Sequence, residues 1–412
     1  MSETKPFDPV KICLVGVSNF ARSHKRCIDV MVEEGVGEFT AAVVRSPQKY
    51  PEALAEYAER GITVYTDYHE FLEAEAGNVE LVALPLSIQT HAEASIAAME
   101  AGYDVLVEKP PAATVQDVDA MIECSERTGR FCDVGFQNQS KSTVRDLKRL
   151  VCDGGLGEIE RVAVMGEWVR DDGYYARNAW AGQMVIDGAY VLDGPTNNAL
   201  AHYMFNALYF ATPRWQEVDS PARVRGELYH AHPIPGEDSS AIAVETSGGV
   251  PITYLSTLAG WEARGPWIRV EGSRGTAHWD FQGPCRIEYA DGSEQVIEPD
   301  GRREHDEVFR NAIRYLRGVD DELNCPIAMA RPITVAVNGA YESGAPPRGI
   351  DAQYITREDR GDKVFTGING IQELLDRCYA ECLTYNDAGA PWGYATEWFD
   401  TSNYTRFEMD LG

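Results

Sequence analysis

The sequence lacks several features that would point to particular classes of protein. None of its segments approaches the roughly 20 consecutive apolar residues of a membrane-spanning helix, so we expect no membrane partner. The opening MSETKPFDPV has no basic start and no apolar stretch, so we do not interpret it as a secretory signal. The nine cysteines form no CxxC pair, which favours a reducing, cytoplasmic setting over a disulfide framework. Cys378 and Cys382 share a predicted helix turn, but no nearby histidine completes a site, and we expect no metal.

Basic residues are scarce. Lys and Arg number 37 against 65 Asp and Glu, and the formal net charge is −28. Such a charge repels phosphate backbones, which argues against a nucleic-acid partner. An anionic cofactor would need local hydrogen-bond donors against this background.

The chain is long enough for two domains, since 412 residues exceed one ordinary core. Short apolar runs alternate with helical patterns up to about residue 138, which predicts a parallel sheet with crossover helices. Such sheets bind ligands beyond the carboxyl ends of their strands. We therefore expect an α/β chain whose residues 1–138 form a Rossmann dinucleotide-binding domain. The predicted strands are 11–16, 39–44, 62–66, 79–84, 104–108 and 131–136.

Residues 139–412 follow a different pattern. Longer alternating runs predict a mostly antiparallel, open sheet in an α+β domain for substrate binding and oligomerisation. We expect helices over one face of this sheet, at 193–210, 306–316, 333–342 and 371–385.

The turn after the first strand carries a weak dinucleotide signal. It reads Gly16-Val17-Ser18-Asn19-Phe20-Ala21, with Gly, Ser and Ala at the three glycine positions of GxGxxG. Backbone N–H groups at a helix start favour phosphate, although the turn could also simply join a strand to a helix.

The second predicted strand ends in Arg45-Ser46. NAD-binding sheets usually have an acidic residue at this point, whereas Arg and Ser can accept a 2′-phosphate. We expect NADP to be preferred, with NAD possible. Arg45 could instead stack on adenine or lie in solvent.

A further motif is Glu108-Lys109-Pro110, which directly follows the apolar run DVLV. A buried charged pair at a strand end is unfavourable unless it is used or well partnered. With GxSxxA, LPLSIQTH and VGFQNQ, this motif resembles the Gfo/Idh/MocA oxidoreductases over roughly the first 140 residues and about 70 beyond.

The resemblance implies an NAD(P)-dependent oxidoreductase that acts on a sugar, sugar acid or polyol, as a homo-oligomer (dimer or tetramer). It places Lys109 beside the nicotinamide and the reacting hydroxyl, where an ammonium can polarise oxygen and move a proton. An ion pair with Glu108 is the alternative. The cofactor contacts that it implies outside the glycine turn are Pro85, Leu86, His91, Glu108, Lys109 and Gln137.

The family's second catalytic element is an Asp followed four residues later by a His. Asp193 fits the Asp, but Asn197 occupies the His position, and an amide cannot shuttle a proton at neutral pH. We take His202 as the nearest substitute and Asn198 as a substrate contact on the same predicted polar stripe. A helix cap for Asp193 and a hydrated helix face are the alternatives.

The segment Trp168–Trp180 contains two Arg, two Tyr and two Trp. Aromatic faces stack on sugar rings, and Arg binds hydroxyls or carboxylates. We predict substrate contacts from Arg170, Tyr175 and Trp180, with core aromatics as the alternative.

Two further functions stay open. Some relatives oxidise a sugar transiently and so act as glycosidases or lyases. The departures at Ser18 and Asn197 would also fit a non-catalytic sugar or cofactor sensor.

Overall fold

The computed structural model describes residues 7–409. These residues form two compact units. The first comprises the described residues up to Ala112, Asp117–Lys141 and Gly301–Ala330; the second comprises Ala113–Gln116, Ser142–Asp300 and the described residues from Arg331.

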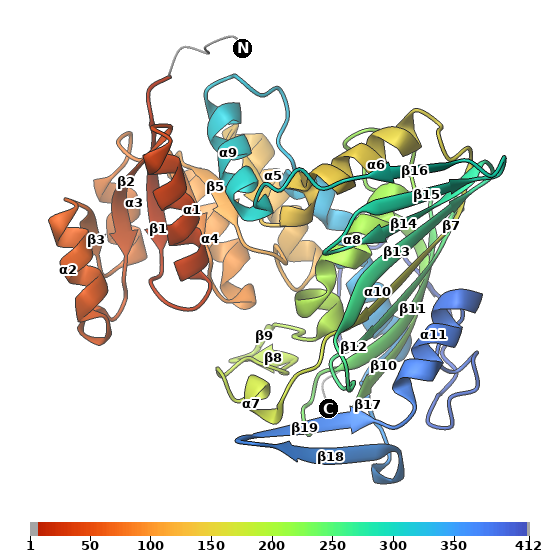
Figure 1. Cartoon of the computed structure of the whole chain (residues 1–412). Helices are drawn as coiled ribbons and strands as arrows, with labels where there is room; N and C mark the ends of the chain where they lie inside the picture. Colours follow the sequence, from red (N-terminus) through yellow and green to blue (C-terminus); the bar gives the residue numbers. More distant parts are fainter. Residues whose placement is uncertain (1–6, 410–412) are drawn as a thin grey trace. The chain divides into compact units, whose positions relative to one another are not determined.

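The first unit is built on a six-stranded parallel sheet (Figure 1). Its order, β3-β2-β1-β4-β5-β6, is that of a Rossmann fold. Every residue of β4 and β5 is buried, as central parallel strands covered by helices require. The strands are β1 Val10–Val15, β2 Gly37–Val43, β3 Thr63–Tyr65, β4 Leu81–Leu84, β5 Asp104–Val107 and β6 Cys132–Val134. The predicted α/β class and all six predicted strands are confirmed.

The helices that accompany this sheet follow its strands in sequence, with one exception. They are α1 Ala21–Glu33, α2 Pro51–Glu59, α3 Tyr68–Ala74, α4 His91–Glu100 and α5 Val115–Thr128. The exception is α9 (Glu304–Leu316), which returns to the first unit from far along the chain.

The predicted boundary at residue 138 therefore needs a correction. Helix α9 was expected on the second sheet, but Val308, Phe309, Ala312 and Ile313 are buried in one core cluster with β1 and α1. Their spacing forms a single apolar stripe. Sequence periodicity identified the stripe, but it cannot tell which sheet the stripe covers.

The second unit contains a large mixed sheet, mostly antiparallel as predicted (Figure 1). Its order is β16-β15-β14-β13-β7-β12-β11-β10-β17, with β20 beside β10. The pairs β7–β12 and β10–β17 are parallel. The strands are β7 Ile159–Glu167, β10 Pro221–His230, β11 Ser239–Thr246, β12 Pro251–Thr257, β13 Arg264–Gly272, β14 Gly275–Asp280, β15 Cys285–Tyr289, β16 Glu294–Ile297, β17 Arg348–Gly349 and β20 Phe399–Asp400. Two hairpins stand apart: β8 Val185–Ile186 with β9 Ala189–Tyr190, and β18 Ile355–Arg360 with β19 Lys363–Ile368.

Helices lie on both faces of this sheet, not on one. Met165 clusters with Leu375 of α11 (Ile371–Glu381), whereas Gly166 faces Leu200, directly before α8 (Ala201–Phe210). Since neighbouring strand residues point to opposite faces, α8 and α11 cover opposite sides. The remaining helices are α6 Ser142–Cys152, α7 Asp172–Tyr175 and α10 Ile327–Gly344.

Two predicted helices also differ in detail. The stretch predicted as one helix from residue 193 contains a π-helical turn, Pro195–Ala199, before α8 begins. Helix α10 begins at Ile327 and continues through Pro332, whereas the usual bias against interior proline placed its start after that residue.

Within residues 7–409, no helix is both long and apolar enough to cross a bilayer. The same residues bring no three His, Cys, Asp or Glu side chains together as a metal site.

Candidate functional site

The glycine turn of the first unit has the backbone shape that a phosphate loop requires. Gly16 ends β1 with a φ of 108°, a conformation that residues with a Cβ rarely adopt. The Ser18 side chain accepts a hydrogen bond from the Tyr50 hydroxyl at 3.2 Å. Helix α1 begins directly after Asn19 and Phe20, at Ala21. Its first N–H groups, those of Ala21, Arg22 and Ser23, donate to the turn carbonyls of Ser18, Asn19 and Phe20 at 3.1, 3.2 and 2.9 Å, so an anion here would be bound by the N–H groups of the turn itself.

A cavity of about 470 Å³ opens beside this turn. It lies where β1, β2 and β4 end, the expected ligand position in a parallel sheet. Of the predicted cofactor residues, Gly16, Arg45 and Leu86 line it, and Ser46 and Pro85 are their chain neighbours. The complete lining is Val15, Gly16, Val43, Arg45, Thr66, Asp67, Tyr68, His69, Leu86, Ser87, Thr90, Glu93, Ala94 and Ala97.

The charges of this cavity are mixed. Arg45 shares the lining with the carboxylates of Asp67 and Glu93. Asp67 also caps α3 by accepting the Glu70 N–H at 2.9 Å. A single exposed guanidinium beside two carboxylates can bind hydroxyls as well as a phosphate, so this lining does not by itself distinguish NAD from NADP.

Glu108 is buried and faces away from this cavity. One carboxylate oxygen lies 2.8 Å from Nε2 of His24 on α1, and the other accepts the backbone N–H of Lys109 at 3.1 Å. Burial alone would raise the pKa of Glu108, but His24, and to a lesser extent Lys109 and His305, hold it below the ordinary value. Glu108 thus fixes the backbone of Lys109, and its direct contact with a cofactor stays a prediction.

A small void of about 10 Å³ adjoins this ion pair, enough for about one water. Its lining includes Glu108, His24, His305 and the predicted cofactor residue Gln137. Sequence reasoning missed His24, although its position one helical turn after Phe20 was a usable signal.

His91 lies behind the loops that flank the cavity. Its ring nitrogens are 2.8 Å from the Pro110 carbonyl and 3.0 Å from the Leu86 carbonyl. Burial lowers its pKa despite these acceptors. A neutral ring donates to one of the two carbonyls, and the ring lies between the turn after Lys109 and the loop after β4. Direct contact of His91 with a cofactor stays a prediction.

In the second unit, Asp193 is the centre of a polar cluster. Its carboxylate accepts the Gly182 N–H and the Asn198 amide, each at 2.7 Å, and lies 3.8 Å from the Arg177 guanidinium. The predicted pair of Asp193 and Asn198 is therefore in contact. Asp193 also holds the loop that carries Gly182.

The residues that follow Asp193 differ in orientation. Asn197 is buried and donates to the Val191 carbonyl at 3.1 Å. His202 lies within α8, all of whose residues are buried. The alternative of a hydrated helix face is therefore wrong, because α8 packs between the sheet and α6. The catalytic roles of Asn197 and His202 stay predictions.

The aromatic segment after β7 forms a compact cluster. The Arg170 guanidinium lies 4.9 Å from the centre of the Tyr174 ring, and that of Arg177 lies 3.5 Å from the same ring. Trp180 lies 5.2 Å from the Arg177 guanidinium. The Tyr175 hydroxyl is buried without a hydrogen bond, and its ring centre is 4.7 Å from that of His232. Arg177 was missed, although it belonged to the segment singled out.

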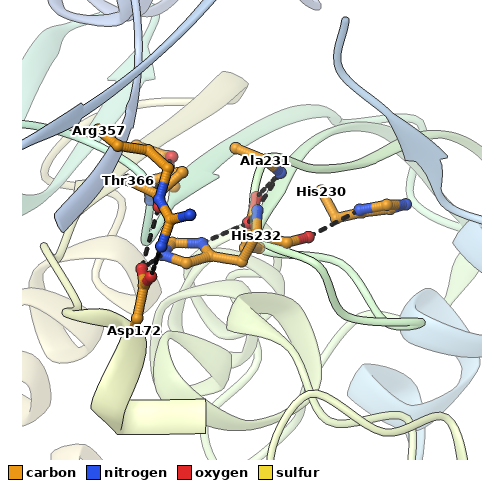
Figure 2. A network of polar contacts seen from close by, with 9 residues as sticks. Asp172, His230, Ala231, His232, Arg357 and Thr366 are labelled. Atoms are coloured by element: carbon orange, nitrogen blue, oxygen red, sulfur yellow. Dashed lines mark hydrogen bonds and ion pairs between the residues drawn. The ribbon is translucent and has the colours of Figure 1, made fainter. Parts of the chain in front are cut away.

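The β18–β19 hairpin holds this segment through polar contacts. Figure 2 shows Arg357, Thr366 and His232 converging on Asp172. His232 is itself held by Asp238, whose carboxylate lies 2.7 Å from its Nδ1. Lys363 pairs with neighbouring Asp171 at 2.9 Å. No local sequence pattern linked residues so far apart in the chain.

With this geometry in place, comparisons with known proteins define the class of the first unit. A family model described as "Oxidoreductase family, NAD-binding Rossmann fold" (Gfo/Idh/MocA) matches residues 10–136. The first unit is therefore an NAD-binding Rossmann domain. In particular, residues 10–136 match the Rossmann domain of the Gfo/Idh/MocA oxidoreductases, which confirms the resemblance for this part of the chain.

Relatives extend the likeness beyond that domain. Inositol 2-dehydrogenase of Salmonella paratyphi B is 29% identical over 150 residues, 36% of this chain and 43% of that protein. The chain thus spans less than half of the length of that curated relative.

Solved structures support the fold of most of the chain. An inositol dehydrogenase homologue from Azotobacter vinelandii, solved with NAD+, has a TM-score of 0.70 at 19% identity and covers 83% of this chain and 97% of its own. The WlbA dehydrogenase of Bordetella pertussis, solved with NADH and UDP-GlcNAcA, has a TM-score of 0.67 at 20% identity and covers 81% and 96%. At these identities the likeness establishes fold alone.

Proposed function

We propose that this protein is an NAD(P)-dependent dehydrogenase acting on a CH–OH group of a sugar, sugar acid or polyol. The observation that carries the proposal is the 470 Å³ cavity beside Gly16, at the carboxyl ends of the sheet whose strand β5 leads into Lys109. The dehydrogenase names of the relatives support it. They give no support to the glycosidase, lyase or sensor alternatives.

Residues of both units have distinct tasks in this proposal. The backbone from Gly16 to Ala21 binds the pyrophosphate, and the bound nicotinamide supplies the hydride donor or acceptor. Lys109 donates a hydrogen bond to the reacting oxygen and moves its proton. Glu108, held by His24, fixes the Lys109 backbone.

In the second unit, Asp193 and Asn198 hold the substrate segment, and Tyr175 and Trp180 present rings to the sugar. His202 is the second candidate for proton transfer. Asn197 could only hydrogen-bond a substrate hydroxyl, because an amide cannot shuttle a proton at neutral pH, and this amide already donates to a backbone carbonyl.

The choice between NAD and NADP is a finer proposal. Arg45 and Ser46 favour NADP, whereas Asp67 and Glu93 in the same cavity oppose a 2′-phosphate. We propose a modest preference for NADP. Tenfold tighter binding of NAD, measured as dissociation constants, would contradict it. A homo-oligomer and a cytoplasmic location are proposed on the family resemblance and the cysteine pattern.

Mass spectrometry of the co-purifying nucleotide, together with a dehydrogenase screen on sugars, uronates and polyols, tests the main proposal. We expect a bound or added dinucleotide to be reduced by at least one compound. A protein that binds no dinucleotide would overturn the proposal. Substrate turnover without any net change in NAD(P)H would instead favour the glycosidase or lyase alternative.

A further inference from the structure

Two guanidinium groups of the second unit meet at a single aromatic ring. Arg170 and Arg177 both lie over Tyr174, and Trp168 and Trp180 complete the stack at 5.6 and 5.2 Å from Arg170 and Arg177. Stacked guanidinium groups keep their in-plane N–H donors available, since the ring occupies only their flat face.

The donors of Arg170 are poorly used within the protein. Arg170 donates a long bond of 3.4 Å to the Val169 carbonyl and a hydrogen bond to the Tyr174 side chain, and its Nε is buried without a hydrogen bond. Arg264 and Arg317, by contrast, each bind a carboxylate at 2.8 Å or less. In a chain with 65 acidic residues, a buried guanidinium nitrogen without a partner is costly unless something else supplies the acceptor.

The acidic residues nearby do not supply that acceptor. Asp171 is neutralised by Lys363, and Asp172 by Arg357. Asp193 lies 3.8 Å from Arg177 and accepts its close bonds from Gly182 and Asn198 instead. Asp193 neutralises one of the two arginines, Arg177. The cluster therefore keeps one positive charge that no carboxylate neutralises.

We propose that Arg170 and Arg177 form an anion subsite that binds a carboxylate of the substrate, so the preferred substrate is a sugar acid and not a neutral sugar or polyol. This inference rests on the proposed function and narrows its substrate class. One surplus charge matches a monoanion. A planar carboxylate matches the paired N–H donors of a guanidinium, and the Trp180 ring offers an apolar face for the attached ring.

The subsite is already rigid in this structure. The two residues that follow Arg170, Asp171 and Asp172, are tied to the β18–β19 hairpin. Figure 2 shows the contact between Asp172 and Thr366. Arg177 donates to the Tyr174 carbonyl at 2.7 Å. Groups held in advance lose little freedom when a ligand binds, which favours selective binding.

Calorimetry on the NAD+-saturated protein tests the subsite through binding, independently of turnover. The probes are three pairs of matched shape: D-glucuronate with D-glucose, D-galacturonate with D-galactose, and D-gluconate with sorbitol. We expect at least one acid to bind ten- to hundredfold more tightly than its neutral partner, about the effect of a charge-assisted hydrogen bond.

Substitutions of the arginines then test which residue causes the preference for acids over their neutral partners. Arg170→Gln should remove at least tenfold of it, and Arg170→Lys should restore part, because Lys keeps the charge but not the planar donors. The control is Arg161→Gln on the same strand region, where an exposed arginine pairs with Glu271 at 2.7 Å; it should keep the selectivity. Arg177→Lys gives a second variant that retains the charge beside Asp193.

The outcomes separate this inference from the proposed function. Equal binding of acids and neutral partners in all three pairs, or selectivity that survives Arg170→Gln, overturns the subsite even if a neutral sugar is oxidised. Arginine-dependent binding of an acid without any reduction of the dinucleotide supports the subsite and counts against the dehydrogenase.

Discussion

The two units fix their functional groups in different ways. In the first unit, Gly16 and Lys109 take their positions from the ends of β1 and β5, and the sheet itself brings them to one edge. In the second unit, Asp172 is fixed by Arg357 and Thr366, which lie more than 180 residues further along the chain. A site at the end of a regular strand depends on local pattern, whereas a site in a loop depends on which distant segments reach it.

This difference explains what the sequence could and could not predict. The six parallel strands and the residues at their ends followed from apolar runs and turn chemistry, because both signals are local. The burial of α8 and the return of α9 to the first unit were missed, since periodicity identifies an apolar face but not its partner. Arg170 could be predicted as a site residue from composition, but its unsatisfied Nε could not.

The largest expected effect tests the strand-end site of the first unit. Lys109→Met should lower turnover by roughly 10² or more, because it removes the group that moves the hydroxyl proton. Cofactor binding should persist, since the cavity lining is untouched. Steady-state kinetics and cofactor titration measure the two effects. Lys25→Met, on the exposed side of α1 beside Asp29, is the control, and near-normal turnover of the Lys109 variant would remove that residue from the mechanism.

Each unit also contains a buried carboxyl group that stays protonated to a higher pH than an exposed carboxyl group. Burial raises the pKa of Asp133 and of Glu237 to about 7, although hydrogen bonds oppose the shift. Glu237 accepts from Thr196 and Tyr341, whereas one oxygen of Asp133 has no hydrogen bond. The folded state therefore keeps protons that the unfolded chain releases above about pH 4.

The contribution of these two groups to stability should accordingly fall as pH rises from about 4 to 7 and level off above that range. Asp133→Asn and Glu237→Gln should each remove part of this slope and raise stability at pH 8 by up to about 3 kcal/mol relative to pH 5. Urea unfolding at both pH values measures it. A slope that neither variant changes would show that both carboxyl groups titrate normally. If one variant changes the slope more than the other, the carboxyl group of that unit has the larger pKa shift.

A smaller effect is expected from the ion pair behind Lys109. His24→Gln keeps a hydrogen bond to Glu108 but removes the imidazole that lowers the pKa of Glu108, so we expect turnover to fall about tenfold, with the Lys109 amine still in place. Because the pKa of Glu108 in the folded protein lies below its ordinary value, this group stabilises the fold at pH values above that ordinary pKa. The stabilisation is lost as pH falls through the folded-state pKa. Losing His24 raises that pKa, so the acid-unfolding midpoint should move to higher pH. A reduced turnover without this shift would point to a merely structural defect.

The smallest expected effect distinguishes the roles of two neighbouring amide side chains of the second unit, Asn197 and Asn198. Asn197 donates to the Val191 carbonyl inside the protein, whereas Asn198 donates to the Asp193 carboxylate. Asn197→Ala should therefore cost about 1 kcal/mol of unfolding free energy and change turnover little, as the loss of one buried hydrogen bond predicts. Asn198→Ala should lower turnover several-fold at nearly unchanged stability, since the freed carboxylate can still bind Gly182 and approach Arg177. If Asn197→Ala were instead the variant that loses turnover, the family's histidine position would be active in this chain despite its buried amide.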